Sequence, residues 1–142
     1  MKLTALSRAV LVASVLACVS LAAQAATITF KATLKASTEV PANSSHGHGM
    51  LTATLNTDTN ELKYHVTYSN LTGPATAAHF HGPAAPGANA GVQVPVTDPA
   101  SPINGAATIT AAQAKDLMDG KWYFNVHTAA NPGGEIRGQV TH

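Results

Sequence analysis

The most regular feature of the chain is an alternation of apolar and polar residues that begins after position 26. The stretch 61–69 shows it best, because every second residue there is apolar: Leu62, Tyr64, Val66 and Tyr68. A period of two places successive side chains on opposite faces, which is typical of a half-buried β-strand. The same kind of pattern predicts further strands over 27–35, 49–55, 75–81, 92–96, 106–110, 121–128 and 135–141.

Turn-forming residues separate these predicted strands. The polar stretch 57–60 joins two of them as a hairpin, and the Asn-Pro-Gly-Gly sequence at 131–134 precedes the last one. Seven or eight short strands at regular spacing predict an all-β fold, either an antiparallel β-sandwich or a Greek-key barrel. No internal repeat or linker is visible, so residues 26–142 are expected to form one domain.

One short helix is expected beside the strands. Thr110 and Gln113 have the spacing of a capping box, in which the two side chains satisfy free backbone N–H groups at a helix start. The segment 111–118 then has room for about two turns before Gly120, a residue suited to end a helix.

The first 25 residues have the organisation of a secretory signal. Lys2 and Arg8 make a positive start, 9–23 is an almost unbroken apolar run, and Ala23-Gln24-Ala25 ends it with small residues at the cleavage positions. We expect cleavage after Ala25 and a secreted or periplasmic chain without a transmembrane segment. A membrane anchor is disfavoured, since a spanning helix needs about 20 apolar residues and no cleavage site. Lipoprotein processing at Cys18 is disfavoured because the apolar run continues past it.

Charge and cysteine content exclude several classes of function. The net charge is +1, and loss of Lys2 and Arg8 leaves six basic and seven acidic residues. This balance lacks the positive surface that nucleic-acid binding requires, so no nucleic-acid partner is expected. The only cysteine, Cys18, leaves with the signal. Disulfides, cysteine nucleophiles and zinc ribbons are therefore excluded from the mature chain.

The seven histidines of the chain are its best candidates for chemistry. If Phe80 faces the core, His79 and His81 lie together on the opposite face of their strand. If Trp122, Phe124 and Val126 face the core, the opposite face of the next long strand carries Tyr123, Asn125 and His127. By the same reasoning, Glu135 and Arg137 share the outer face of the last strand.

These faces define a candidate metal site on His79, His81 and His127. Two histidines at i and i+2 have Cβ atoms about 6.5–7 Å apart, and their imidazoles can share one Cu or Zn ion. Asn125, Glu135 and Arg137 are its expected supporting residues. Glu135 and Arg137 have three open roles: orienting an imidazole, pairing with each other at the surface, or binding an anion. The alternative is a structural hydrogen-bond cluster, because imidazoles readily bond to loop carbonyls.

The other histidines are expected to be structural or solvated. His46 and His48 fall in a polar stretch that reads as a solvated loop, and His65 lies on the polar face of its strand. Catalytic signatures are also missing from the chain, which has no Gly-x-Ser-x-Gly or His-Glu-x-x-His sequence and few carboxylates. An enzyme is therefore the less favoured interpretation.

Three segments resemble the CHRD domain family. They are His79-Phe80-His81-Gly82-Pro83-Ala84, the segment from Leu117 to Thr128, and Asn131-Pro132-Gly133-Gly134-Glu135-Ile136-Arg137-Gly138-Gln139. Glu39-Val40-Pro41 matches an earlier landmark of the family. The resemblance implies an extracellular or periplasmic β-sandwich of immunoglobulin-like type. The family takes its name from chordin, an inhibitor of secreted growth factors, but that role is not expected of a short single-domain chain.

The leading hypothesis is a secreted, non-catalytic CHRD-type binding protein with a Cu or Zn site on the three histidines. One alternative is a metal-dependent enzyme that uses an open coordination position for redox or hydrolytic chemistry. Another is a metal-free adhesion or interaction module that binds an extracellular or periplasmic protein through an edge strand or the Pro83 to Asn89 loop.

Overall fold

The computed structural model describes residues 26–142, and the predicted signal segment lies outside the described residues. The strands are β1 (Thr27–Lys35), β2 (His48–Asn56), β3 (Glu61–Ser69), β4 (Ala75–His81), β5 (Val92–Pro95), β6 (Ile103–Thr108), β7 (Trp122–Thr128) and β8 (Ile136–Val140). A 3-10 turn, Ala36–Thr38, follows β1, and the helix α1 (Ala111–Met118) precedes β7. No helix within residues 26–142 has the length and apolar character needed to cross a membrane.

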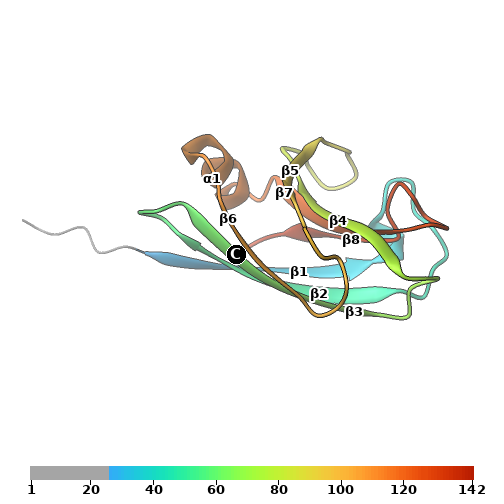
Figure 1. Cartoon of the computed structure of the whole chain (residues 1–142). Helices are drawn as coiled ribbons and strands as arrows, with labels where there is room; N and C mark the ends of the chain where they lie inside the picture. Colours follow the sequence, from blue (N-terminus) through green and yellow to red (C-terminus); the bar gives the residue numbers. More distant parts are fainter. Residues whose placement is uncertain (1–25) are drawn as a thin grey trace, which may run out of the picture.

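All eight strands belong to one antiparallel sheet in the order β5-β4-β7-β8-β1-β2-β3-β6. The sheet folds back on itself, so that β4, β7 and β8 lie over β1, β2 and β3 (Figure 1). The two layers are joined where β8 meets β1, through the pair Lys35–Arg137 and a bridge between Lys31 and Thr141. The expected antiparallel all-β fold with one helix is confirmed, whereas an immunoglobulin-like topology is not.

The core fills the space between the two layers. Each long strand contributes alternate apolar side chains, as period two predicts. The largest fully buried ones are Phe30, Leu34, Leu51, Leu55, Leu62, Phe80, Trp122 and Phe124. The Phe80 ring packs edge-on against Tyr64 and Phe124, with centroid distances of 5.1 and 4.8 Å. The inward orientation of Phe80, Trp122 and Phe124 is confirmed, so their strand neighbours face the other way.

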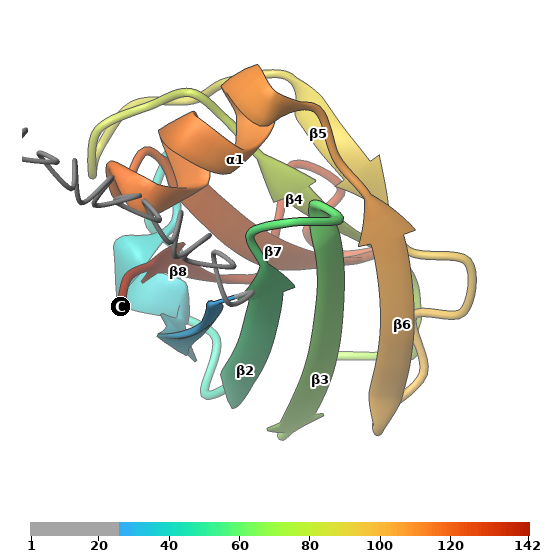
Figure 2. The same ribbon diagram turned by 90° about the vertical axis from the view of Figure 1, so that its left-hand side faces the viewer.

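The helix closes one end of the molecule (Figure 2). Its start has the predicted capping box, in which Thr110 accepts from the Gln113 N–H and Gln113 accepts from the Thr110 N–H. Ala114 and Leu117 bury one side of the helix in the core. An isolated helix of this length is unstable in water, so burial of Ala114 and Leu117 against the core is what holds it in place.

Two strands begin earlier than predicted. β6 begins at Ile103, three residues earlier than expected, because Ile103 is buried opposite Val66. Gly105 lies inside this strand, and a Cβ there would lie 2.2 Å from the Tyr64 ring, so the strand needs a glycine at this close approach. His48 belongs to β2 and pairs with Lys35 and Ser69, so the expected solvated loop at 44–49 is shorter than predicted.

Candidate metal centre

The pairing of β4, β7 and β8 brings the candidate residues into neighbouring rows on one face. One row holds His79, Asn125 and Arg137, which pair directly across the three strands. The next row holds His81 and Tyr123, and His127 lies on the other side of Asn125 along β7. The expected convergence of three histidines from two strands is therefore confirmed by the strand register.

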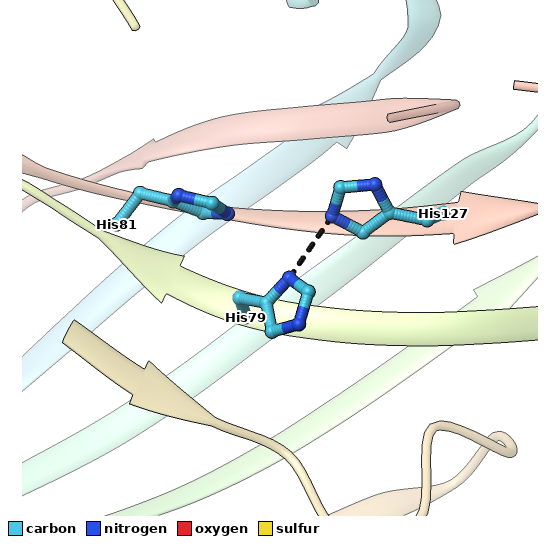
Figure 3. Close-up of side chains that lie close together, drawn as sticks. All are labelled: His79, His81 and His127. Carbon is cyan, nitrogen blue, oxygen red and sulfur yellow. Dashed lines mark hydrogen bonds between the residues drawn. The ribbon is translucent and has the colours of Figure 1, made fainter. Parts of the chain in front are cut away.

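The three imidazoles face one another (Figure 3). His79 Nδ1 lies 3.1 Å from His127 Nε2, and the ring of His79 is 4.9 Å from that of His127 and 5.3 Å from that of His81. One ring nitrogen from each histidine lies within 4.8 Å of the others. Within residues 26–142, His79, His81 and His127 form the group of potential ligand residues whose spacing could hold a metal ion.

Backbone carbonyls orient two of the rings. His81 Nδ1 is 2.9 Å from the Ala90 carbonyl oxygen, and His127 Nδ1 is 2.9 Å from that of Pro132. A carbonyl oxygen can only accept, so each Nδ1 carries the proton and each Nε2 of a neutral ring presents a lone pair. This is the arrangement in which metal-binding histidines are commonly held, with the second nitrogen hydrogen-bonded to the protein.

Burial keeps two of the rings neutral. The pKa of His79 is lowered from 6.5 by burial and then by the neighbouring His127 and His81. The pKa of His81 is lowered mainly by burial, although its bond to Ala90 and the nearby Asn125 side chain act in the opposite direction. His81 Nε2 is buried and makes no hydrogen bond. Neutral imidazole is the form that binds metal, so these shifts favour ligation at neutral pH.

The size of the cluster is close to that of a metal site. Ligand distances of about 2.0–2.1 Å to Cu or Zn place tetrahedral or trigonal nitrogens roughly 3.3–3.5 Å apart. The 3.1 Å separation between His79 and His127 is close to this, while the widest separation of 4.8 Å must shorten by about 1.3 Å. His79 is only half-buried, and rotation of its side chain is the simplest way to close the gap.

Asn125 reaches the same spot. Its Oδ1 lies 2.9 Å from His127 Nε2. The other end of the amide points toward Glu39, since a Cβ built on Gly134 would lie 2.8 Å from Asn125 Nδ2 and 2.2 Å from Glu39 Oε1. Gly134 has φ +132°, so this turn favours glycine for both its backbone and its space.

Arg137 is buried rather than exposed. Its guanidinium lies 3.4 Å from the centroid of the Tyr123 ring, and the His81 ring stacks on the same tyrosine at 4.8 Å. Because β7 runs between β4 and β8, the tyrosine ring separates the imidazole from the guanidinium. Arg137 also donates to Asn89 Oδ1 at 2.8 Å and to the Ala88 carbonyl at 2.6 Å. It thereby fastens the 82–91 loop over the site.

Glu135 is also buried and does not pair with Arg137, so a surface pair of these residues is a wrong expectation. Its carboxylate accepts four hydrogen bonds: from Ser45 Oγ, Thr128 Oγ1, and the N–H and Oγ1 of Thr72. Burial alone raises the pKa of Glu135, but these hydrogen bonds outweigh it and lower the pKa from 4.5 to about 2. Glu135 thus joins two loops to the end of β7 beside His127 and has no hydrogen bond to the imidazoles.

The sequence did not reveal the cover over this face. All seven residues of β7 are buried, which means that both faces of the strand are covered. The 82–91 loop and the 131–134 turn provide this cover, through Ala88, Asn89, Ala90 and Pro132. Strand periodicity cannot show that a loop returns over the polar face. The Gly-Pro sequence after His81 was the only hint of such a loop.

Glu39 is the residue of the site that the sequence analysis left without a role. It is 5 % exposed, and its Oε1 makes no hydrogen bond. Burial raises its pKa, while the Val40 N–H, the charge of Arg137 and the Asn125 side chain lower it. The signal that pointed to Glu39 was its position in the Glu39-Val40-Pro41 landmark.

The remaining histidines lie elsewhere. His65 is exposed and bonds to Asn104 across β3 and β6, as expected for a surface residue. His48 bonds to Ser69, and His142 packs edge-on against Phe30 at 5.5 Å.

Comparison with known proteins gives one family. The model of the CHRD domain matches residues 30–140, which is most of the chain. No curated protein and no solved structure matches the chain. The matched range contains all three clustered histidines together with Glu39, Asn125, Glu135 and Arg137.

Proposed function

The chain belongs to the CHRD domain family, and from that premise we propose that it is an exported, non-catalytic binding protein that holds one Cu or Zn ion on His79, His81 and His127. The observation that carries the proposal is the convergence of ring nitrogens whose lone pairs face a common point.

An excess of acceptors at that point favours a cation. His81 Nε2 and His127 Nε2 are unprotonated when their rings are neutral, and Asn125 Oδ1 can only accept. His79 Nδ1 can supply one N–H, and it lies against His127 Nε2. One donor cannot satisfy three acceptors. Facing lone pairs in a buried site repel one another unless a positive charge lies between them, and a metal ion supplies that charge.

The surrounding structure holds the rings ready for the ion. Two rings are anchored by carbonyls, and one of them stacks on Tyr123. Anchoring reduces the rotamer entropy that binding would otherwise cost. The neutral imidazoles also release little proton on binding, so the site works at neutral pH.

Export is the second part of the proposal. It is supported by the positive, apolar and small-residue order of residues 1–25. A site made of imidazoles, without thiolates, suits an oxidising compartment, because it has no cysteine that could be lost to a disulfide.

The experiment is a metal titration of the protein without an affinity tag. Zn(II), Cu(II) and Cu(I) are each titrated against a competing chelator, and thermal unfolding is followed with and without the ion. We expect one tight site per chain. At a free metal concentration 100 times Kd, binding to the native state alone adds about 2.7 kcal/mol to the unfolding free energy.

Alanine variants of the three histidines locate the site. His79→Ala, His81→Ala and His127→Ala should each abolish the tight site, while the matched control His65→Ala should keep it, since His65 is exposed on β3. Millimolar binding by the unaltered protein, or equal binding by all four variants, would refute the metal site. The cluster would then be a structural hydrogen-bond network in a binding module.

A further inference from the structure

An amide oxygen lies beside the histidine cluster, and a buried carboxylate lies near the other end of the same amide. Asn125 Oδ1 is 2.9 Å from His127 Nε2, and the Asn125 side chain also interacts with His81. The oxygen therefore lies among the histidines that the proposed site would use. An amide oxygen at this place can ligate the same ion as a fourth donor.

The orientation of an asparagine amide is decided by its neighbours, because a half-turn exchanges its oxygen and its NH2 group. Here both neighbours are acceptors: His127 Nε2 on one side and Glu39 on the other. Hydrogen bonds to an ionised group are roughly twice as strong as neutral ones. The carboxylate therefore takes the NH2 end, and the oxygen is left facing the imidazoles.

Glu39 is placed for this role, beside a charge interaction with Arg137. It is 5 % exposed, its Oε2 accepts only a long 3.4 Å bond from the Val40 N–H, and its Oε1 has no partner of good geometry. Oε1 and Asn125 Nδ2 share the space above Gly134, which lacks the Cβ that would block it. An incompletely bonded buried carboxylate is costly, so its retention needs a compensating interaction.

We propose that Asn125 Oδ1 is the fourth ligand of the metal centre and that Glu39 is the positioning residue that turns this oxygen toward the ion. The inference rests on the proposed three-histidine site. The ion then has three nitrogen donors and one oxygen donor. The Glu39 carboxylate, at the other end of the Asn125 amide, offsets part of the positive charge of the ion.

This donor set selects the class of ion. An amide oxygen is a hard ligand and imidazole is intermediate, whereas Cu(I) is favoured by thiolates and thioethers. With Cys18 removed, the thioethers of methionine are the soft donors of the mature chain. Met50 is 57 % exposed on β2 and Met118 lies on α1, so neither belongs to the cluster on β4 and β7. The site is therefore one for a divalent ion, Zn(II) or Cu(II), in preference to Cu(I).

The test is a double-mutant cycle between the two residues, read by Zn(II) affinity and by the visible spectrum of Co(II) as a probe of coordination. Asn125→Leu removes the ligand and Glu39→Gln removes its orienting charge at equal size. Asn125→Asp supplies an oxygen at both ends of the side chain, so it needs no orientation. The matched control is Glu61→Gln, an exposed carboxylate on β3.

We expect Asn125→Leu and Glu39→Gln each to weaken Zn(II) binding about 10–100-fold, the usual range for a residue that orients a metal ligand. In the Asn125→Asp background, Glu39→Gln should not weaken Zn(II) binding, because the aspartate needs no orienting partner and loses a neighbouring like charge. The intense Co(II) bands of four-coordinate geometry should weaken in Asn125→Leu, and Glu61→Gln should match the unaltered protein.

Two results would overturn the inference. Equal Zn(II) affinity and Co(II) spectra in Asn125→Leu and the unaltered protein would remove Asn125 as a ligand. An equal loss of Zn(II) affinity from Glu39→Gln in the unaltered protein and in Asn125→Asp would remove the positioning role of Glu39. Far-ultraviolet circular dichroism of each variant shows whether the fold is kept. If each of His79→Ala, His81→Ala and His127→Ala still lacks the tight site in either case, the proposed function stands and only the proposal of a fourth ligand fails.

Discussion

Glu135 makes the most quantitative prediction, because the structure defines both its environment and its charge. Its carboxylate is 0 % exposed and accepts hydrogen bonds from Ser45, Thr72 and Thr128. Ser45 and Thr72 lie in two loops and Thr128 ends β7, and the three meet beside the histidine cluster. The perturbation is Glu135→Gln, which preserves the size of the side chain and removes the charge.

The expected cost follows from the pKa. A shift from 4.5 to about 2 means that the folded protein favours the ionised form by about 3 kcal/mol at neutral pH. Glutamine replaces one acceptor oxygen by an NH2 group that faces hydroxyl donors. The amide oxygen can keep the Thr72 N–H and Ser45 bonds of Oε1, but the NH2 group replaces Oε2, so the Thr72 and Thr128 hydroxyls can no longer donate there and the bonds to a charged acceptor are lost. We expect Glu135→Gln to lower the unfolding free energy at pH 7 by about 2–3 kcal/mol.

The pH dependence has a definite sign. Glu135 binds a proton more weakly in the folded state than in the unfolded state, so its contribution is fully present above pH 4.5. It is lost as the pH falls from 4.5 toward 2. Glu39 acts in the opposite direction, since its raised pKa makes the folded state gain stability as the pH falls. The difference between the unaltered protein and Glu135→Gln isolates the contribution of Glu135.

The assay is urea unfolding at several pH values between 7 and 2.5, followed by fluorescence. Trp122 is the only tryptophan of the chain and is fully buried, so its emission reports the loss of the core. The stability difference between the two proteins should be largest at pH 7 and shrink below pH 4.5. Glu61→Gln is the control, because its exposed pair with Lys63 should contribute less than about 1 kcal/mol.

The reasoning about Glu135 would be refuted by either of two results. One is equal stability of Glu135→Gln and the unaltered protein at pH 7. The other is a parallel loss of stability in both proteins between pH 4.5 and 2.5, which would show that Glu135 does not titrate with a lowered pKa.

Three further predictions concern the elements around the site. Arg137→Lys keeps the charge but cannot both stack on Tyr123 and donate to two acceptors, so we expect a loss of about 1–3 kcal/mol and faster proteolysis within the 82–91 loop. Gly134→Ala should lower stability by about 1–3 kcal/mol, because its Cβ would overlap Glu39 and its φ is +132°; Gly133→Ala, with open space around it, should melt like the unaltered protein. Thr110→Ala should cost about 1 kcal/mol through loss of the helix cap, measurable by urea unfolding.

Most of the fold and part of the site could be predicted from the sequence. Alternation along 61–69 and 121–128 identified the strands and the inward aromatic residues, because period two is a local property of a half-buried strand. The same periodicity placed His79 and His81 on the outer face of one strand and His127 on the outer face of another strand. It could not show that β4 and β7 are neighbours, which follows from pairing between residues about 45 positions apart.

Local pattern alone settled which side chains turn away from the core, because a strand alternates its faces wherever it lies. Only the tertiary structure decided that this polar face is itself buried, since the 82–91 loop and the 131–134 turn return over it and bring backbone carbonyls to the histidines. Glu39 reaches Asn125 from the segment that follows β1. A surface position and a buried one can have the same alternation. Glu135 and Arg137 were expected on one outer face, with a surface pair as one of three open roles. Long-range contacts, which no local pattern records, instead make them two separate buried anchors.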